Sequence, residues 1–197
     1  MRHYAPALQL SSDDRVVTWL PLYHDMGLIA CYLMPLMCGV PFYQMDPFDW
    51  LIQPDLLLQT IEAKKATVCF LPNFAYHLLA SKGKAHDLGS MRLFVNCSEP
   101  ARRSSHERFL SKHPSTPAGS LSVCYALAEN TFAVSQTGPG QGSREILFKE
   151  RRVLSCGSIL PGTEVRVFDR DAEGEGAPSS GFAVHPDSSS HEFHQTH

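Results

Sequence analysis

Three groups of polar residues in this chain each follow an apolar, strand-like run. They are His24–Asp25, the segment 96–100 (NCSEP) and the segment 125–131 (YALAENT). Runs of β-branched and aromatic residues that end at a proline or a polar cluster are typical of buried strands. In an open α/β sheet, the carboxyl ends of the strands form the edge at which ligands bind. The sequence therefore predicts a binding site built from three loops at one edge of a sheet.

The second and third groups have the chemistry to bind a flat heterocycle that carries phosphate. The ring of Tyr125 and the backbone of 98–100 are able to enclose such a heterocycle, and stacking adds about 1 kcal/mol beyond burial. Glu129 offers the hard oxygen that Mg²⁺ takes alongside phosphates. Thr131 offers a hydroxyl for a phosphate oxygen.

Each of these residues also has a simpler structural explanation. Asp25 would act only as a helix N-cap and His24 as an ordinary loop histidine. Tyr125 would belong to the core, Glu99 would interact with a helix dipole, and Glu129 would be a solvated surface side chain. Three such groups at successive strand ends favour a binding site over these separate explanations.

The elements that must position these groups alternate between strands and helices. Strands are predicted at 15–20, 40–45, 67–71, 91–95 and 120–125. Helices are predicted at 25–38, 48–52, 55–65, 73–82 and 101–112, with a short helical turn at 128–131. Strands that are apolar throughout indicate an α/β fold, in which a mostly parallel sheet is covered by helices on both faces.

This alternation ends after residue 132. Residues 138–142 (GPGQG) are expected to form a flexible loop, and 164–168 (EVRVF) alternate like an edge strand. From residue 170 onward Gly, Pro, Ser and His dominate without any periodicity. We therefore predict a domain at 1–169 and a disordered tail at 170–197.

Composition narrows the class of protein. The 197 residues are 43% hydrophobic and 19% charged, with a net charge of −3, which is typical of a globular protein and does not indicate nucleic-acid binding. The longest apolar run, 26–37, is too short to span a membrane, and the N-terminus lacks the apolar core of a signal peptide. The six cysteines show no CxxC spacing and indicate reduced, buried thiols. We expect a cytoplasmic protein.

Four motifs of the chain resemble those of one enzyme family. They are WLPLYHDMGL (19–28), PNFAYHLL (72–79), NCSEP (96–100) and YALAENT (125–131). In this order they resemble motifs of the acyl-adenylate-forming superfamily, and most closely those of the fatty acyl-AMP ligases. The resemblance extends from about Ser12 to Asp169, because CGSILPGTEVRVFD (156–169) is similar to the family strand that follows. It implies a central fragment of the large N-terminal domain of such an enzyme.

The resemblance also implies which residues would hold the nucleotide. Tyr125 would stack on adenine, and the opposite side of the adenine slot would be formed by Ser98, Glu99 and Pro100. Ala126 would adjoin the nucleotide, at a position where the family usually has glycine. If that position needs a left-handed backbone, alanine costs about 1–2 kcal/mol.

Three further residues would contact the reacting groups. By the resemblance, Glu129 would hold the Mg²⁺ of ATP, Thr131 would lie near the α-phosphate, and His24 would line the junction between the fatty acyl carboxylate and the nucleotide. Members of the family join a fatty acid to AMP and release pyrophosphate. They usually pass the acyl group to the thiol of an acyl carrier protein or a polyketide synthase. A carboxylate that attacks a phosphate brings anions together, so such a site must supply cations and aligned donors.

Several family features are not found in this sequence. The family's lysine-ending phosphate loop lies upstream of the His24 motif, and its ribose-binding aspartate and lid lysine lie downstream of Asp169. Since the loss of one such donor typically costs ~10²–10³-fold in rate, we expect little or no ligase activity from this chain by itself. The alternatives are an acyl-CoA synthetase-type ligase and a non-catalytic remnant or binding scaffold. A Cys–His hydrolase using Cys97 or Cys124 is disfavoured, because neither cysteine lies in a glycine-flanked turn.

Overall fold

The computed structural model describes residues 3–148, 151–165 and 192–194. Within these residues the strands form one sheet, in the spatial order β2-β1-β3-β4-β5-β6-β8-β7, with β9 paired to β8. The five strands at the start of this order are all parallel. They are β2 (Phe42–Gln44), β1 (Val16–Thr18), β3 (Val68–Leu71), β4 (Leu93–Asn96) and β5 (Leu121–Ala126). A mostly parallel α/β fold, as predicted from the sequence, is confirmed.

Helices connect the parallel strands. They are the π-helix η1 (Met26–Leu33) with α2 (Met34–Cys38), α3 (Pro47–Ile52) with α4 (Asp55–Lys64), α5 (Asn73–Lys82) and α6 (Arg103–Lys112). Three short helical segments complete the described helices: α1 (Tyr4–Ala7), η2 (Ala118–Ser120) and η3 (Ala128–Asn130). None of the helices in the described part of the chain combines the length and the hydropathy needed to cross a membrane.

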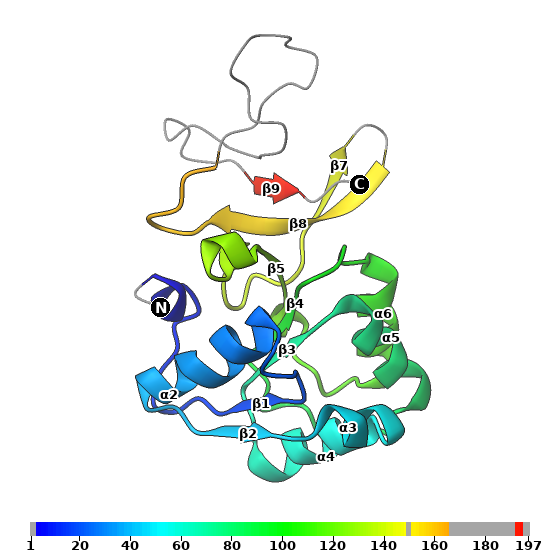
Figure 1. The fold of residues 1–197 in the computed structure, drawn as a ribbon. Helices are drawn as coiled ribbons and strands as arrows, with labels where there is room; N and C mark the ends of the chain where they lie inside the picture. The colour runs from blue at the N-terminus through cyan, green and yellow to red at the C-terminus, as the bar shows by residue number, and fades with distance from the viewer. Residues whose placement is uncertain (1–2, 149–150, 166–191, 195–197) are drawn as a thin grey trace, which may run out of the picture.

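The strand order explains why helices cover both faces of the sheet. From β1 the chain steps to β2 on one side, whereas from β3 it steps through β4 to β5 on the other side. Since connections between parallel strands are nearly always right-handed, opposite steps place their helices on opposite faces. Accordingly, η1 and α2 lie on one side of the strands, and α5 and α6 lie on the other (Figure 1).

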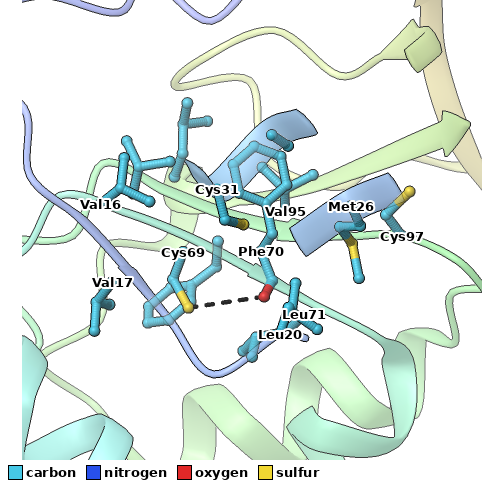
Figure 2. Packing of buried hydrophobic residues seen from close by; sticks show 14 of the residues in the cluster. Val16, Val17, Leu20, Met26, Cys31, Cys69, Phe70, Leu71, Val95 and Cys97 are labelled. Atoms are coloured by element: carbon cyan, nitrogen blue, oxygen red, sulfur yellow. Dashed lines mark hydrogen bonds between the residues drawn. The ribbon is translucent and has the colours of Figure 1, made fainter. Parts of the chain in front are cut away.

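The core lies on both faces of the central strands, against η1 on one face and against α4, α5 and α6 on the other. All residues of β1, β3 and β4 are buried, because both faces of these strands are covered. Figure 2 shows Met26 and Cys31 of η1 facing side chains of the strands, among them Val16, Phe70 and Val95. All six cysteines are free thiols, and all except Cys38 are buried.

The first long helix differs in detail from the predicted α-helix at 25–38. Residues Met26–Leu33 form a π-helix, and α2 follows with Pro35 in its first turn. Proline lacks the N–H that a continuing helix would need, so the change of hydrogen-bonding pattern at this point has a local cause. The helix ends at Gly39, whose φ of 66° is left-handed, as expected for a glycine stop signal.

An antiparallel extension of the sheet, β6 to β8, was not predicted from the sequence. It consists of β6 (Ala133–Gln136), β7 (Glu145–Phe148) and β8 (Arg151–Ile159). Strand β6 is short, and β8 contains Gly157 at a left-handed φ of 78°, so neither shows a clean alternation of polar and apolar residues. The loop predicted at 138–142 lies between β6 and β7.

The predictions for the C-terminal part can be compared with the structure only at the residues that it describes. Of the predicted edge strand at 164–168, Glu164 and Val165 are described and are not in a strand, while 166–168 lie outside the described residues. The predicted domain end at 169 also lies outside them. In the predicted tail, only β9 (Glu192–His194) is described, and it pairs with β8. At these three residues the structure differs from the predicted disorder, because the edge of β8 offers backbone partners.

Candidate functional site

The loops that carry the three polar groups emerge at the same edge of the sheet. Strands β1, β3, β4 and β5 are parallel and in register, since Val17 pairs with Cys69, Cys69 with Phe94, and Phe94 with Leu121. Their carboxyl ends therefore point in the same direction. The step from β1 to β2 and the step from β3 to β4 run in opposite directions, so the fold has its topological switch point between β1 and β3, where ligands bind in open α/β sheets.

His24 and Asp25 lie just beyond β1, at the start of η1. The Asp25 Oδ1 accepts a hydrogen bond of 2.8 Å from the backbone N–H of Met26, so Asp25 is the N-cap of this helix. His24 Nδ1 lies 2.7 Å from the same Oδ1 and 3.2 Å from the Met26 nitrogen. We assign the proton to Nδ1 because the contact with the carboxylate is the shorter one. No described residue hydrogen-bonds to Nε2 of this half-exposed imidazole, so Nε2 can act as an acceptor.

Gly27 allows η1 to approach the end of the first strand closely. A Cβ atom at this position would lie 2.2 Å from the carbonyl oxygen of Pro21, far inside van der Waals contact. Only glycine fits between the helix and this backbone. The glycine of the HDMG motif therefore fixes where His24 and Asp25 lie relative to the sheet.

The loop after β4 touches the loop after β1. The Ser98 hydroxyl lies 3.7 Å from the Met26 sulfur, which joins the NCSEP motif to the first turn of η1. Ser98 has a left-handed φ of 77°, a backbone conformation that is uncommon for a residue with a Cβ. Such strained residues often cluster at ligand-binding sites.

Glu99 holds the start of α5. Its Oε1 accepts a hydrogen bond of 2.7 Å from the backbone N–H of Phe74, in the first turn of that helix. The structure thus shows the interaction with a helix N-terminus that the simpler explanation proposed, although the helix is α5 and not the one that follows Glu99 in sequence. Glu99 and Pro100 are both partly exposed on this loop.

A buried polar network supports the same loop from below, and sequence analysis missed it. The side-chain amide of Asn96 lies 3.2 Å from Asn73 Oδ1 and 2.8 Å from His106 Nε2. Asn73 Oδ1 also accepts from the backbone N–H of Arg102, and His106 Nδ1 lies 3.2 Å from the Ser143 hydroxyl. Two asparagines after apolar strands were the only signal that the sequence offered.

Burial keeps the histidine of this network neutral. It lowers the pKa of His106 to about 4, so the ring is uncharged at neutral pH. An acceptor at Nε2 for the Asn96 amide requires the proton on Nδ1, which then donates to Ser143. The network therefore ties α5, α6 and the end of β4 together without any charge.

Tyr125 lies on β5 in a small second core. It is 9% exposed and packs with Val123, Val134, Leu154, Cys156 and Val165. Ala101, directly after the NCSEP motif, packs against this cluster. Burial raises the pKa of Tyr125, and the nearby Cys156 and Glu129 raise it further. The ring is thus largely covered, in a cluster that the residue after the NCSEP loop adjoins.

The YALAENT loop turns back sharply after β5. The backbone N–H of Leu127 donates to the Phe132 carbonyl, and within this closed loop Glu129 and Thr131 are both exposed. Thr131 has a φ of 68° and a ψ of −45°, which is strained for a β-branched residue.

Ala126 does not adopt the left-handed backbone conformation that would have made alanine unfavourable at this position. It is paired with Ala133 in the sheet and is not among the left-handed residues of the described chain. The conditional cost of alanine at this position therefore does not arise. The strain of this region lies instead at Ser98 and Thr131.

The residues at this edge are compatible with Mg²⁺ only together with a ligand. The described residues contain no group of three or more His, Cys, Asp or Glu side chains that could hold a metal ion. Mg²⁺ is usually bound by one or two carboxylates plus phosphate oxygens and water. Glu129, as an exposed carboxylate at a strand end, fits that pattern.

The cysteines of this region are poor candidates for a nucleophile. Cys97 and Cys124 are almost completely buried, and burial together with the neighbouring Cys97 raises the pKa of the Cys124 thiol well above its usual value. Because the thiolate is the reactive form, this geometry argues against the Cys–His hydrolase.

A search of protein families matches residues 1–180 to the AMP-binding enzymes. The chain belongs to this family. The match covers all three loops at the sheet edge and continues beyond residue 169, where the sequence predicted the domain to end. The four motifs and the predicted α/β fold are therefore those of an AMP-binding domain.

Relatives of this AMP-binding chain include enzymes named for fatty acids. It is 32% identical over 188 residues to a medium-chain-fatty-acid–[acyl-carrier-protein] ligase of Moorena producens, with 81% of this chain and 31% of that enzyme covered. It is 36% identical over 154 residues to a ligase of the same description from Teredinibacter turnerae, with 75% of this chain and 24% of that enzyme covered. The chain thus spans less than a third of these relatives.

Solved structures agree with the fold. The fatty acid AMP ligase of Legionella pneumophila has a TM-score of 0.79 and 28% identity, with 85% of this chain and 33% of that protein covered. A fatty acyl-adenylate ligase from the same organism, solved with acyl adenylate and pyrophosphate, has a TM-score of 0.76 and 26% identity, with 82% and 33% covered.

Proposed function

We propose that this AMP-binding chain is the nucleotide-holding part of a fatty acyl-AMP ligase. The complete enzyme would join a fatty acid to AMP with release of pyrophosphate, and it would then transfer the acyl group to the thiol of an acyl carrier protein. The reactants would be ATP and a fatty acid, and the carrier would be free or part of a polyketide synthase.

One observation carries this proposal. In a chain of the AMP-binding family, the loops after β1 and β4 touch at Ser98 and Met26, and the residue after the NCSEP loop packs against the cluster that holds Tyr125. A purine held between Tyr125 and 98–100 would have its phosphate directed toward the loop that carries Glu129 and Thr131. The acyl carboxylate would then approach from the side of His24.

His24 suits this position chemically. With its proton on Nδ1 and directed at Asp25, the half-exposed imidazole has Nε2 available at the end of β1. Nε2 can accept a hydrogen bond as a neutral ring, or donate one to an oxyanion when the ring is protonated. We infer that His24 orients the carboxylate beside the α-phosphate.

In this scheme Thr131 would contact the phosphate. Thr131 is exposed on this loop, so its hydroxyl is available at the place where a phosphate oxygen would lie. Glu129, on the same loop, would hold Mg²⁺, which when bound supplies positive charge to the phosphates of ATP.

The acceptor thiol distinguishes the proposal from its nearest alternative, an acyl-CoA synthetase-type ligase. Relatives include a putative acyl-CoA synthetase of Caulobacter vibrioides, 33% identical over 154 residues. The relatives described as carrier-protein ligases favour the carrier as the acceptor. Comparing acyl transfer to an acyl carrier protein with transfer to coenzyme A decides between the two.

Nucleotide binding tests the proposal on the chain itself. A dodecanoyl sulfamoyl adenosine, which is a stable analogue of an acyl adenylate, is titrated into the 197-residue chain by calorimetry, with sulfamoyl adenosine and free dodecanoate as controls. We expect saturable binding of the complete analogue. Absence of binding by a folded chain would argue for a non-catalytic remnant.

Catalysis is tested by the fatty-acid-dependent exchange of labelled pyrophosphate into ATP. The assay is run on this chain and on a version extended upstream, where the resemblance places the phosphate loop. Exchange in the extended version that requires both a fatty acid and Mg²⁺ supports the proposal. Exchange that does not respond to fatty acids contradicts the proposed substrate.

A further inference from the structure

A polar groove runs between α5 and α6, on the face of the sheet opposite to η1. Its volume is about 550 Å³, and the two helices that form it pack through Tyr76 and Phe109, whose rings are 5.4 Å apart. The residues that line it are His77, Ala80 and Ser81 of α5 and Ser104, Glu107, Arg108, Ser111 and Lys112 of α6. None of these side chains belongs to the nucleotide site described above.

Small side chains make the groove. Four of its lining residues are small: Ala80 and Ser81 on α5, and Ser104 and Ser111 on α6. Helices are commonly recognised in grooves of the partner surface, and small side chains leave space for a helix to lie along this one.

The surface of α6 is unusually basic for this chain. The segment 102–112 contains four cations (Arg102, Arg103, Arg108 and Lys112) and one carboxylate (Glu107), whereas the whole chain has a net charge of −3. The buried face of the helix is formed by Ser105, His106 and Phe109, which leaves the charged residues on the outer face. Positive charge is therefore concentrated on one helix of an otherwise acidic chain.

In the part of the chain that the structure describes, the cations of the groove lack carboxylate partners. Glu107 is paired with Arg103, at 2.6 Å. Among the described residues, Arg108 and Lys112 form no ion pair, and Arg108 Nη1 instead lies 3.2 Å from His77 Nδ1. Like charges four residues apart on a helix are destabilising. An arrangement of this kind is compensated when an external anion occupies the groove.

We propose that the α5–α6 groove is a docking surface for an acidic helix of a partner protein. Resting on the proposed function, that partner is the acyl carrier protein that accepts the acyl group. The small residues would admit the helix backbone, and Arg108 and Lys112 would pair with its carboxylates. Electrostatic docking of this kind sets association rate and specificity.

Binding of a fluorescently labelled bacterial holo-acyl carrier protein to the 197-residue chain tests the proposal, with anisotropy measured at several salt concentrations. We expect saturable binding that weakens as salt rises. The double variant R108E/K112E should bind at least about tenfold more weakly. The matched control K64E/K84E makes the same change in net charge at exposed lysines away from the groove and should bind as the unmodified chain does.

A second variant shows whether the occupant of the groove is a helix or a small anion. Ala80→Trp fills the groove without changing its charge, and it should weaken carrier binding as strongly as the charge reversal. If A80W binds the carrier normally while millimolar inorganic phosphate abolishes binding, the groove holds only a small anion and the proposal is wrong. Equal losses in R108E/K112E and K64E/K84E, or equally tight binding of a single-stranded RNA, would also overturn it.

The test of the docking surface can fail independently of the test of the proposed function. Carrier binding is measured without ATP or fatty acid, and circular dichroism confirms that each variant is folded. If the carrier binds and adenylate formation fails, only the proposed function is lost. If adenylate forms while no carrier binds to the chain, the docking surface is wrong and the nucleotide site is retained.

Discussion

Glu99 and Phe74 are joined by a hydrogen bond of 2.7 Å from the backbone N–H of Phe74 to the carboxylate of Glu99. Through it, the loop after β4 caps the helix that follows β3, although the two residues are 25 positions apart in sequence. The N–H groups in the first turn of a helix have no partner within the helix. A carboxylate at this end also interacts favourably with the helix dipole.

Removal of this cap should destabilise the chain. Glu99→Ala is expected to lower the free energy of unfolding by about 1–2 kcal/mol, the usual range for a lost N-cap. Glu99→Gln keeps an acceptor oxygen and should cost less. Glu107→Ala, which breaks an exposed ion pair on α6, is the control and should cost about 0.5 kcal/mol or less. Urea unfolding measures all three, and equal effects of E99A and E107A would contradict this role.

Substitution of Gly27 should be far more harmful than substitution of another helix glycine. In Gly27→Ala the new Cβ would lie 2.2 Å from the Pro21 carbonyl oxygen, and the displacement is expected to cost about 3 kcal/mol. Gly39→Ala has open space around the Cβ and only a left-handed φ to accommodate, at about 1–2 kcal/mol. Thermal unfolding of both variants checks the order, and the reverse order would show that η1 can shift away from the sheet.

The buried His106 should make stability depend on pH. Its pKa is lowered by burial to about 4 in the folded chain, while it returns to its ordinary value near 6.5 on unfolding. The unfolded chain therefore binds a proton first, so the stabilisation is present above pH ~6.5 and is lost as pH falls toward 4. The loss amounts to about 3 kcal/mol at most.

His106→Gln isolates this effect from that of other histidines. His86 responds in the opposite direction: burial lowers its pKa, but hydrogen bonds to Glu62 and Asp55 raise it above the ordinary value. His86 thus stabilises the fold at low pH, and its contribution is lost as pH rises through its folded pKa. Urea unfolding between pH 4 and 8 should show a flatter acid limb for H106Q. Parallel curves for the two proteins would exclude His106 as the source.

Replacing Thr131 by glycine should leave the chain more stable than replacing it by alanine. At a φ of 68° alanine still has a Cβ, whereas glycine does not, so Thr131→Gly should exceed Thr131→Ala in unfolding free energy by about 1 kcal/mol. Exposed helix positions show the reverse order because glycine costs entropy there. Ala63→Gly, on the outer face of α4, compared with the unmodified chain, provides that control.

On the proposed function, Tyr125 should affect nucleotide affinity through its ring. Tyr125→Leu preserves an apolar side chain in the small second core but removes stacking, which is worth about 1 kcal/mol. We expect roughly fivefold weaker binding of the dodecanoyl sulfamoyl adenosine, and near-normal binding by Tyr125→Phe. Calorimetric titration of both variants is the measurement. Unchanged affinity in Y125L would place the adenine elsewhere.

The parallel half of the fold could be read from the sequence because its signals are local. The segments 67–71 and 91–95 are apolar throughout, as strands buried on both faces must be, and β3 and β4 lie there. Gly39 ends its helix as a glycine stop signal, whereas Asn73 is the first residue of α5 and makes no capping hydrogen bond. The antiparallel strands gave no such signal, because β6 and β8 acquire their strand character from pairing with each other and with β5.

By itself the sequence determined that strand ends with polar groups exist, and its motifs identified the family to which they belong. Only the tertiary structure decided which side chains meet. Glu99 caps a helix from another part of the chain, and Tyr125 lies in a small core with residues of β8. The left-handed backbone conformations are found at Ser98 and Thr131 and not at Ala126. The reason is physical: the hydrophobic pattern is a property of neighbouring residues, whereas capping, burial and strain depend on partners that only folding brings together.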